Sequence, residues 1–300
     1  RYGLHLQDEV EAELVALAGR IEPGRPWRGV AARLRDNGRI PEAGLLAAYR
    51  DQVRSAEQFI REDGLMPVPD GPVNVVSTPP FLEALVPFAA YDPPPVEMAD
   101  PTGRFYVTIP SATLPADVRL RMLRGHCSYE IPSTVVHEAY PGHHLQLLTA
   151  HALPSEVRQH LWTPLTGEGW ALYAETLMAQ RGFFAGPEAR LFHLMNLLWR
   201  AVRITLDVGL HTRGMTPLEA VDQLASRLPM ERRNAESEVR RYCAMPTYNL
   251  CYAVGRREIL RLRDDYRARA GTAYRPEAFH SDLLSYGGLP VSLARWGMNL

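Results

Sequence analysis

The feature that most constrains this fold is a proline and a glycine within an otherwise helical stretch, VVHEAYPGHHLQLL at residues 135–148. Proline has no amide hydrogen, and the ring of Pro141 would collide with the carbonyl of His137, four residues earlier. Gly142 can adopt backbone conformations that other residues avoid. A regular helix therefore cannot continue unbent through this point, and the backbone must make a detour between the flanking side chains.

Apolar residues recur at helical spacing over most of the chain, which predicts a mainly helical fold with one small sheet. The predicted helices cover residues 8–19, 41–61, 133–150, 154–162, 166–181, 187–213, 217–227, 231–242, 247–269 and 276–285. Two extended segments are predicted, VNVVST near residue 73 and a strand over 105–109 with apolar residues at alternate positions. We expect the sheet to lie beside the helix that contains the proline.

Three segments follow one another along the chain. Residues 1–65 are predicted to be helical, 66–132 to form proline-rich loops with the small sheet, and 133–300 to be a helical region that carries the chemical motifs. A chain of 300 residues with 46% apolar composition can bury a substantial core, so we expect one compact unit. The 33 basic and 34 acidic residues nearly cancel, so neither nucleic acid nor a membrane surface is an expected partner. No apolar run reaches the roughly 20 residues of a membrane span.

Composition excludes several chemistries. Every basic residue is arginine, which removes lysine nucleophiles, lysine Schiff bases and Walker A phosphate loops. The three cysteines, Cys127, Cys243 and Cys251, lack CxxC spacing and argue against disulfide frameworks or thiolate zinc sites. This usage slightly favours a reducing compartment such as the cytoplasm. Because the chain starts at Arg1 without methionine, a removed upstream segment, and with it export, stays open.

The pair His137-Glu138 begins a stretched version of the zinc-hydrolase pattern HExxH. That pattern supplies two histidine ligands one helical turn apart and a glutamate that takes a proton from water. If residues 141 and 142 loop out, His143 takes the place of the second histidine. In an unbroken helix His144 would instead lie within about 20° of His137, so it is the second choice. A solvated polar patch is the alternative without a metal.

A third ligand is expected from the segment GEGWALYAETLM. Glu168 follows His143 by 25 residues and is the ligand candidate, while Glu175 lies seven positions further on the same helical face and could orient a histidine. The letters GEG also form half of a GxGxxG nucleotide motif. Position 172 is leucine, however, and no strong strand precedes it, so that interpretation fails.

Polar residues also gather on one stripe of the helix predicted over 187–213: Arg200, Arg203, Asp207 and His211. An internal ion-pair network explains this stripe as well as a role at the site does. Donors to a reaction oxyanion could come from His211 or Tyr252. Further residues could support the metal ligands without binding the metal: Arg203, Asp207, Arg256 and His280.

The motifs HEAYPGHHLQ, EGWALYAE, RAVRITLDVGLH, PTYNLCYAVG and FHSDLLSYGGLP, together with FYVTIPSA, resemble the DUF885 family of bacterial proteins over most of the chain. That family is regarded as zinc-dependent metallopeptidases related to the gluzincins. The resemblance implies a helical metallopeptidase-like fold, with zinc held by His137, His143 and Glu168 and with Glu138 as the base. Members are usually longer at the N-terminus, so this chain resembles the C-terminal part of one. Met215 and Tyr248-Asn249 depart from the commoner pattern.

The expected function is therefore zinc-dependent cleavage of peptide bonds, with Glu138 as general base and Tyr252 or His211 as an oxyanion donor. The predicted strand over 105–109 is expected to pair with an extended peptide at the sheet edge. Two alternatives remain: a zinc amidase or tailoring enzyme that acts on a small non-peptide metabolite, and an inactive homologue that binds metal or partners. The oligomeric state is not indicated.

Overall fold

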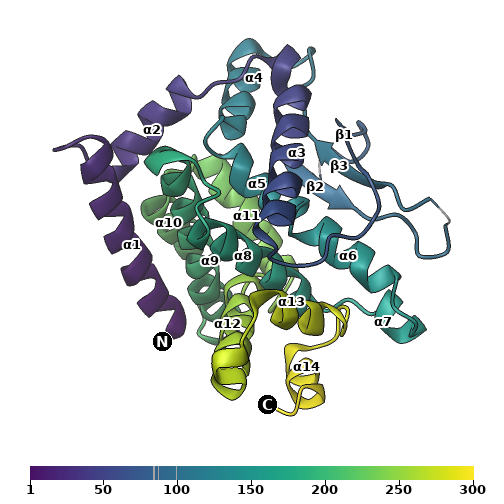
Figure 1. Cartoon of the computed structure of the whole chain (residues 1–300). Helices are drawn as coiled ribbons and strands as arrows, with labels where there is room; N and C mark the ends of the chain where they lie inside the picture. The colour runs from purple at the N-terminus through teal and green to yellow at the C-terminus, as the bar shows by residue number, and fades with distance from the viewer. Residues whose placement is uncertain (84, 87, 99) are drawn as a thin grey trace.

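The computed structural model describes residues 1–83, 85–86, 88–98 and 100–300 and is mainly helical, as predicted (Figure 1). The α-helices are α1 (Tyr2–Ile21), α2 (Trp27–Asn37), α3 (Leu45–Asp63), α4 (Ala116–Leu123), α5 (Ile131–Glu138), α6 (His143–His151), α7 (Glu156–His160), α8 (Pro164–Gln180), α9 (Gly186–Thr212), α10 (Pro217–Arg227), α11 (Arg232–Ala244), α12 (Cys251–Ala270), α13 (Pro276–Leu284) and α14 (Val291–Gly297). Short 3-10 turns are η1 (Glu42–Gly44), η2 (Arg124–His126) and η3 (Gly271–Ala273). None of the described helices is both long and apolar enough to cross a lipid bilayer.

The sheet has three strands, β1 (Val73–Ser77), β2 (Ala89–Asp92) and β3 (Gly103–Val107), in the order β1-β3-β2. β1 runs parallel to β3, and β2 runs antiparallel to it. Phe105, at the centre of β3, faces Val75 on one side and Tyr91 on the other. The prediction that this strand offers an edge to substrate is therefore wrong, because both of its edges are already paired. The strand that lies next to the helix α5 is β2.

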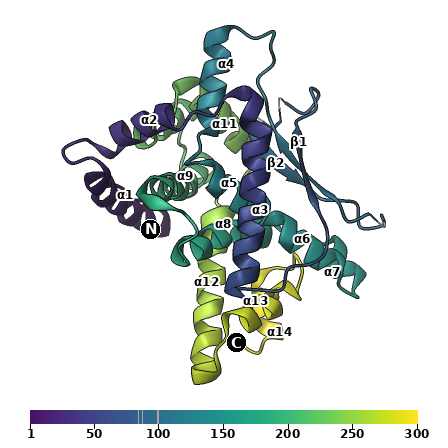
Figure 2. The ribbon, with the colours of Figure 1, turned by 45° about the horizontal axis from the view of Figure 1, so that its top comes forward.

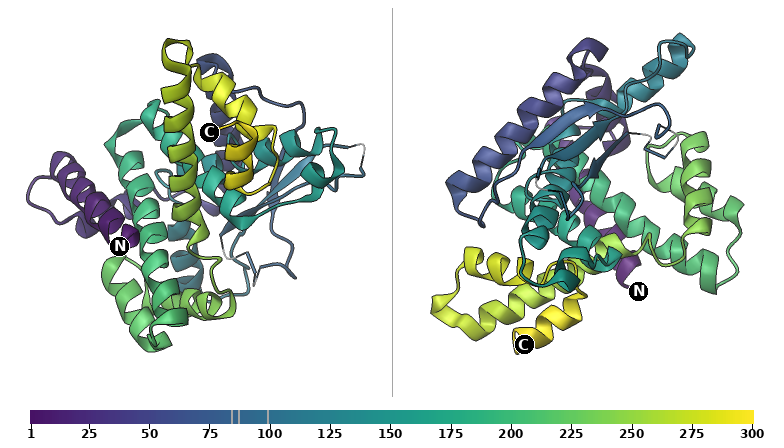
Figure 3. Two further views of the ribbon diagram at one scale, coloured as in Figure 1. Left: turned by 90° about the horizontal axis from the view of Figure 1, so that it is seen from below. Right: turned by 90° about the vertical axis from the view of Figure 1, so that its right-hand side faces the viewer.

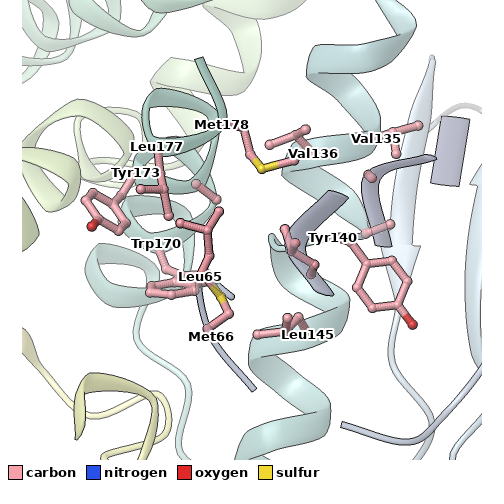
Figure 4. Packing of buried hydrophobic residues seen from close by; sticks show 14 of the residues in the cluster. Leu65, Met66, Val135, Val136, Tyr140, Leu145, Trp170, Tyr173, Leu177 and Met178 are labelled. Atoms are coloured by element: carbon pink, nitrogen blue, oxygen red, sulfur yellow. The ribbon is translucent and has the colours of Figure 1, made fainter. Parts of the chain in front are cut away.

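The buried apolar residues form two clusters. One gathers α3, α5, the sheet and the C-terminal helices around α8, and Figure 4 shows its centre, where Leu65 lies beside Trp170 and Met178 beside Val136. The other joins α1 and α2 to α9, α10 and α11. The sheet lies on one side of the helical body beside α3, and α1 and α2 lie on the other (Figure 2). The last helices, α13 and α14, pack beside α12 (Figure 3).

Helices α8 and α12 cross at two glycines, and this crossing positions the site. A Cβ on Gly169 would lie 2.6 Å from the Cα of Gly255, and a Cβ on Gly255 would lie 2.0 Å from the carbonyl oxygen of Leu165. Only glycine allows two backbones to approach this closely. The contact brings Glu168 of α8 next to the start of α12, where Tyr252 lies.

Candidate metal centre

The helix predicted over 133–150 is two helices separated by a detour of the backbone. α5 ends at Glu138, and α6 begins at His143. A Cβ on Gly142 would lie 1.9 Å from the carbonyl oxygen of His137, so only glycine fits at this position. The predicted interruption at the proline and glycine is thus present, and it changes the direction of the chain between the two histidines.

The detour is fixed by an aromatic side chain from α8. The indole Nε1 of Trp170 donates a 2.8 Å hydrogen bond to the carbonyl of Pro141, and its ring is buried in the core of Figure 4. Three residues earlier, a Cβ on Gly167 would lie 2.1 Å from the indole Nε1 of Trp162. The glycines on both sides of Glu168 therefore let α8 pack tightly, and they hold its carboxylate opposite the detour.

Three predicted ligands come together at this point. One ligand atom from each of His137, His143 and Glu168 lies within 4.8 Å of the other two. The Nε2 atoms of His137 and His143 are each 3.4 Å from Oε2 of Glu168. Their side chains are 7%, 12% and 7% exposed, respectively. The two imidazole rings are perpendicular to each other, with centroids 4.9 Å apart.

These separations fit a tetrahedral zinc site. Zinc bonds of about 2.0–2.2 Å to nitrogen and oxygen place two ligand atoms of a tetrahedral site about 3.3–3.6 Å apart. Oε2 of Glu168 is buried and has no hydrogen-bond partner among the described residues. A buried carboxylate oxygen without a partner costs free energy, and a cation bound between the three side chains would remove that cost. The residues present therefore fit the metal that the sequence predicts.

Glu175 orients the first histidine. Its Oε1 lies 2.9 Å from Nδ1 of His137, and its Oε2 accepts a 2.7 Å hydrogen bond from Ser133. Burial alone would raise the pKa of Glu175, but the guanidinium of Arg200 and the bond to His137 hold it well below its ordinary value. The carboxylate thus stays ionised and accepts from Nδ1, so that Nε2 of His137 faces the cluster.

The same carboxylates make the cluster favourable for positive charge. Burial opposes protonation of His137, yet its contacts with Glu168 and Glu175 outweigh this and raise its pKa to about 9. Burial alone would raise the pKa of Glu168, but the two histidines hold it well below the ordinary range. A bound cation would displace the proton from His137, and the site would then offer two imidazole nitrogens and one ionised carboxylate, a donor set typical of zinc.

Tyr248 contacts the other oxygen of Glu168, and sequence reasoning assigned this tyrosine no role. Its hydroxyl donates a 2.6 Å hydrogen bond to Oε1 of Glu168. The turn that carries it is held by Asp207, whose two oxygens lie 3.2 and 3.1 Å from the amide of Thr247. Thr247 has a φ of 69°, which is unusual outside glycine, so this support matters. The four-residue spacing from Tyr248 to Tyr252 is the signal that could have indicated it.

A cavity of 740 Å³ opens onto the cluster. Glu138 lines it, and Oε2 of Glu138 accepts a 2.9 Å hydrogen bond from the amide of Tyr91 in β2. The ring of Tyr252 also lines the cavity and lies 6.1 Å from the ring of His137, tilted by 22°. The base candidate, the oxyanion candidate and the three predicted ligands thus line the same cavity.

His144 points away from the cluster. Its Nδ1 lies 2.9 Å from the hydroxyl of Tyr91, and its Nε2 lies 3.0 Å from the hydroxyl of Tyr140 and 3.1 Å from the carbonyl of Gly71. Burial lowers its pKa to about 4, so it is a neutral core histidine. The second-choice ligand is therefore not among the three clustered residues.

The polar stripe of α9 does not converge on the cluster. His211 is exposed, its Nε2 lies 3.1 Å from the carbonyl of Tyr242, and it is not among the residues that line the cavity. The guanidinium of Arg203 is buried against Tyr242 and the carboxylate of Glu238, and its centre lies 4.9 Å from the ring of Tyr252. Arg203 therefore supports the tyrosine and makes no contact with the ligands.

The two remaining candidates serve the packing of α8. His280 is buried, with 2.8 Å from its Nε2 to the hydroxyl of Tyr173 and 2.7 Å from its Nδ1 to the carbonyl of Leu65. Nε of Arg256 donates a 2.7 Å hydrogen bond to the hydroxyl of Thr176. Neither side chain contacts a clustered ligand.

Comparisons with known proteins give the same fold and no assigned activity. The family described as "Bacterial protein of unknown function (DUF885)" matches residues 1–298. A candidate lipoprotein from Colwellia psychrerythraea has a similar structure, with a TM-score of 0.89 at 22% identity over 99% of this chain and 51% of the other. A candidate lipoprotein of unknown function from Shewanella oneidensis gives 0.88 at 25% identity over 99% and 55%. This chain thus spans about half the length of either protein. No curated protein matches the sequence.

Proposed function

Because this chain belongs to the DUF885 family, whose function is unknown, we propose from the site itself that it is a zinc-dependent hydrolase of peptide bonds. The observation that carries the proposal is the pair of 3.4 Å separations from the two histidine Nε2 atoms to Oε2 of Glu168. That oxygen is buried and has no hydrogen-bond partner among the described residues, and Glu138 lines the same cavity as the three side chains.

His137, His143 and Glu168 would hold the ion. When bound, zinc supplies Lewis acidity that polarises a carbonyl and lowers the pKa of water. Glu138 follows His137 directly, and the amide of Tyr91 fixes one of its oxygens. Its carboxylate takes a proton from the attacking water and returns it to the leaving amine.

Tyr252 is a better candidate for the oxyanion donor than His211. Its ring lines the cavity, whereas His211 bonds to a backbone carbonyl elsewhere. Burial raises the pKa of Tyr252 above its ordinary value, so the hydroxyl keeps its proton at neutral pH and can donate it in a hydrogen bond.

The outer edge of β2 takes the substrate-pairing role that the sequence predicts for the strand at 105–109. The backbone carbonyl of Phe88 accepts from the amide of Thr108 in the sheet. Backbone groups of successive residues point to opposite edges of a strand, so those of Ala89 and Tyr91 point away from β3. The amide of Tyr91 does face outward, but it already donates to Glu138, so the backbone groups left for a peptide are those of Ala89 and the carbonyl of Tyr91. An extended peptide that pairs with this edge would pass the base and the metal ligands.

The substitution Glu138→Gln tests the assignment. We expect the variant to keep one zinc ion per chain and to lose at least about 100-fold in kcat/KM on peptides, because the proton acceptor is gone. Glu62→Gln, at an exposed position on α3, is the matched control and should keep full activity. Equal activity of Glu138→Gln and the parent, or a zinc-loaded parent that cleaves no amide, would contradict the proposal.

A further inference from the structure

One arginine on the cavity wall has no part in the chemistry proposed above. Arg241, near the end of α11, lines the same cavity as Glu138 and Tyr252. Its side chain is 35% exposed, so the guanidinium reaches solvent from this wall. Among the described lining residues it is the single arginine.

Arg241 belongs to a cluster with more positive than negative charge. Its Nη2 lies 2.7 Å from Oε2 of Glu238, and Nη2 of Arg203 lies 3.2 Å from the same oxygen. Burial would raise the pKa of Glu238, but both guanidiniums lower it, so the carboxylate is ionised. One negative charge is thus shared by two positive charges, and one positive charge is left over.

The excess positive charge belongs to the guanidinium that faces the cavity, that of Arg241. The side chain of Arg203 is 6% exposed and is closed in by aromatic rings, whereas that of Arg241 is 35% exposed. In the described chain Arg241 uses Nη2 for its bond to Glu238, which leaves the donors on Nε and Nη1 available. A planar guanidinium with free donors matches a carboxylate in geometry and in charge.

The cavity therefore combines a site for amide cleavage with a separate positive group. We infer that Arg241 binds the C-terminal carboxylate of the substrate, so that the preferred substrates are peptides with a free C-terminus. This inference rests on the proposed peptide hydrolysis and narrows its substrate class. Tyr248 and Tyr252 line the cavity together with Arg241, so a peptide bound at the metal centre can extend toward the guanidinium.

Binding without turnover tests the inference separately from catalysis. The zinc-loaded Glu138→Gln protein is equilibrated with N-acetylated tripeptide libraries that have either a free or an amidated C-terminus, and the bound fraction is measured by ultrafiltration and mass spectrometry. We expect the free acids to bind about 10- to 100-fold more tightly than the amides, as charged hydrogen bonds allow. Adding Arg241→Gln should remove this preference, and Arg241→Lys should keep part of it.

Arg240→Gln is the matched control, because Arg240 is exposed on the same helix and does not line the cavity. It should leave the preference unchanged. A third library, with amidated C-termini and one Asp or Glu, separates the two sources of a carboxylate. A preference that follows the acidic side chain would overturn the C-terminal assignment.

Equal binding of acids and amides by the parent, or an unchanged preference in Arg241→Gln, would also overturn the inference. Thermal melts establish whether Arg241→Gln is folded, and if it is not, the parent and Arg241→Lys decide the question. The proposed hydrolysis fails by a different result. In that case a carboxylate preference is measured, but the zinc-loaded wild-type protein cleaves none of the bound peptides.

Discussion

The α5–α6 region and α9 both carry several polar side chains, but they arrange them in opposite ways. In α5–α6 the helix is interrupted, and two histidines six residues apart approach one carboxylate oxygen, Oε2 of Glu168. α9 is an unbroken helix of 27 residues, and its polar side chains go to separate partners. These partners are Glu175 for Arg200, Glu238 and Tyr242 for Arg203, the Thr247 amide for Asp207 and the Tyr242 carbonyl for His211.

The difference follows from helix geometry. Residues three or four apart on a straight helix are displaced by about 4.5–6 Å along its axis, so four of them cannot reach one point. The detour at Pro141 and Gly142 redirects the chain and removes that restriction. α9 instead joins α8, α11 and the turn before α12, so its polar side chains hold neighbouring elements in place. The comparison therefore separates residues that would bind the metal from residues that support them.

The largest effect is expected from Gly142→Ala, because this substitution disrupts the detour itself. The added Cβ would lie 1.9 Å from the carbonyl oxygen of His137, so the backbone must shift. We expect a loss of at least about 3 kcal/mol in the free energy of unfolding, the upper range for overpacking, together with loss of zinc binding. Denaturant unfolding and metal analysis measure both quantities.

Gly19→Ala is the control for a glycine without this role. A Cβ on Gly19, which is within α1, would have no atom within 4 Å, so alanine should stabilise the helix by up to about 1 kcal/mol. If Gly142→Ala were as stable as the parent and bound zinc equally well, the detour would not be what brings the histidines together.

The adjacent pair His143 and His144 gives the next largest contrast. We expect His143→Ala to weaken zinc binding by more than about 100-fold. The substitution removes a proposed ligand, and losing a ligand lowers metal affinity more than losing a residue that only supports one. His144→Ala should keep the zinc and lower stability by about 2 kcal/mol, because the hydroxyls of Tyr91 and Tyr140 lose their partner. Chelator competition and thermal melts measure these changes. The reverse pattern would make His144 the ligand.

The helical fold and the histidine pair could be predicted from local spacing, with His143 preferred over His144, whereas Glu168 was predicted from its 25-residue interval and the family resemblance. Pro141 and Gly142 are local signals. The partners of Asp207 and His211 depend on how α9 packs against α11 and α12, which no spacing within α9 indicates. The position of β3 in the middle of the sheet depends on β2, a four-residue strand with weak alternation that was not predicted.

Asp207→Ala should have a smaller effect, because this residue acts through the turn before α12. Removing the carboxylate leaves the amide of Thr247 without its acceptor, so we expect a loss of about 2 kcal/mol in stability. Zinc affinity should fall by less than about tenfold, since Tyr248 is displaced but the three ligands remain. Asp222→Ala, on the exposed face of α10, is the control and should match the parent. A loss of zinc as large as that of His143→Ala would place Asp207 among the ligands.

His211→Ala should have the smallest effect, and it tests whether the stripe of α9 contributes anything to the reaction. The side chain is exposed and bonds to one backbone carbonyl, so stability should change by no more than about 0.5 kcal/mol. If Tyr252 is the oxyanion donor, kcat/KM should stay within about twofold of the parent, while Tyr252→Phe lowers kcat by roughly 100-fold. A large fall in kcat for His211→Ala, with zinc binding intact, would show that α9 reaches the reaction after all.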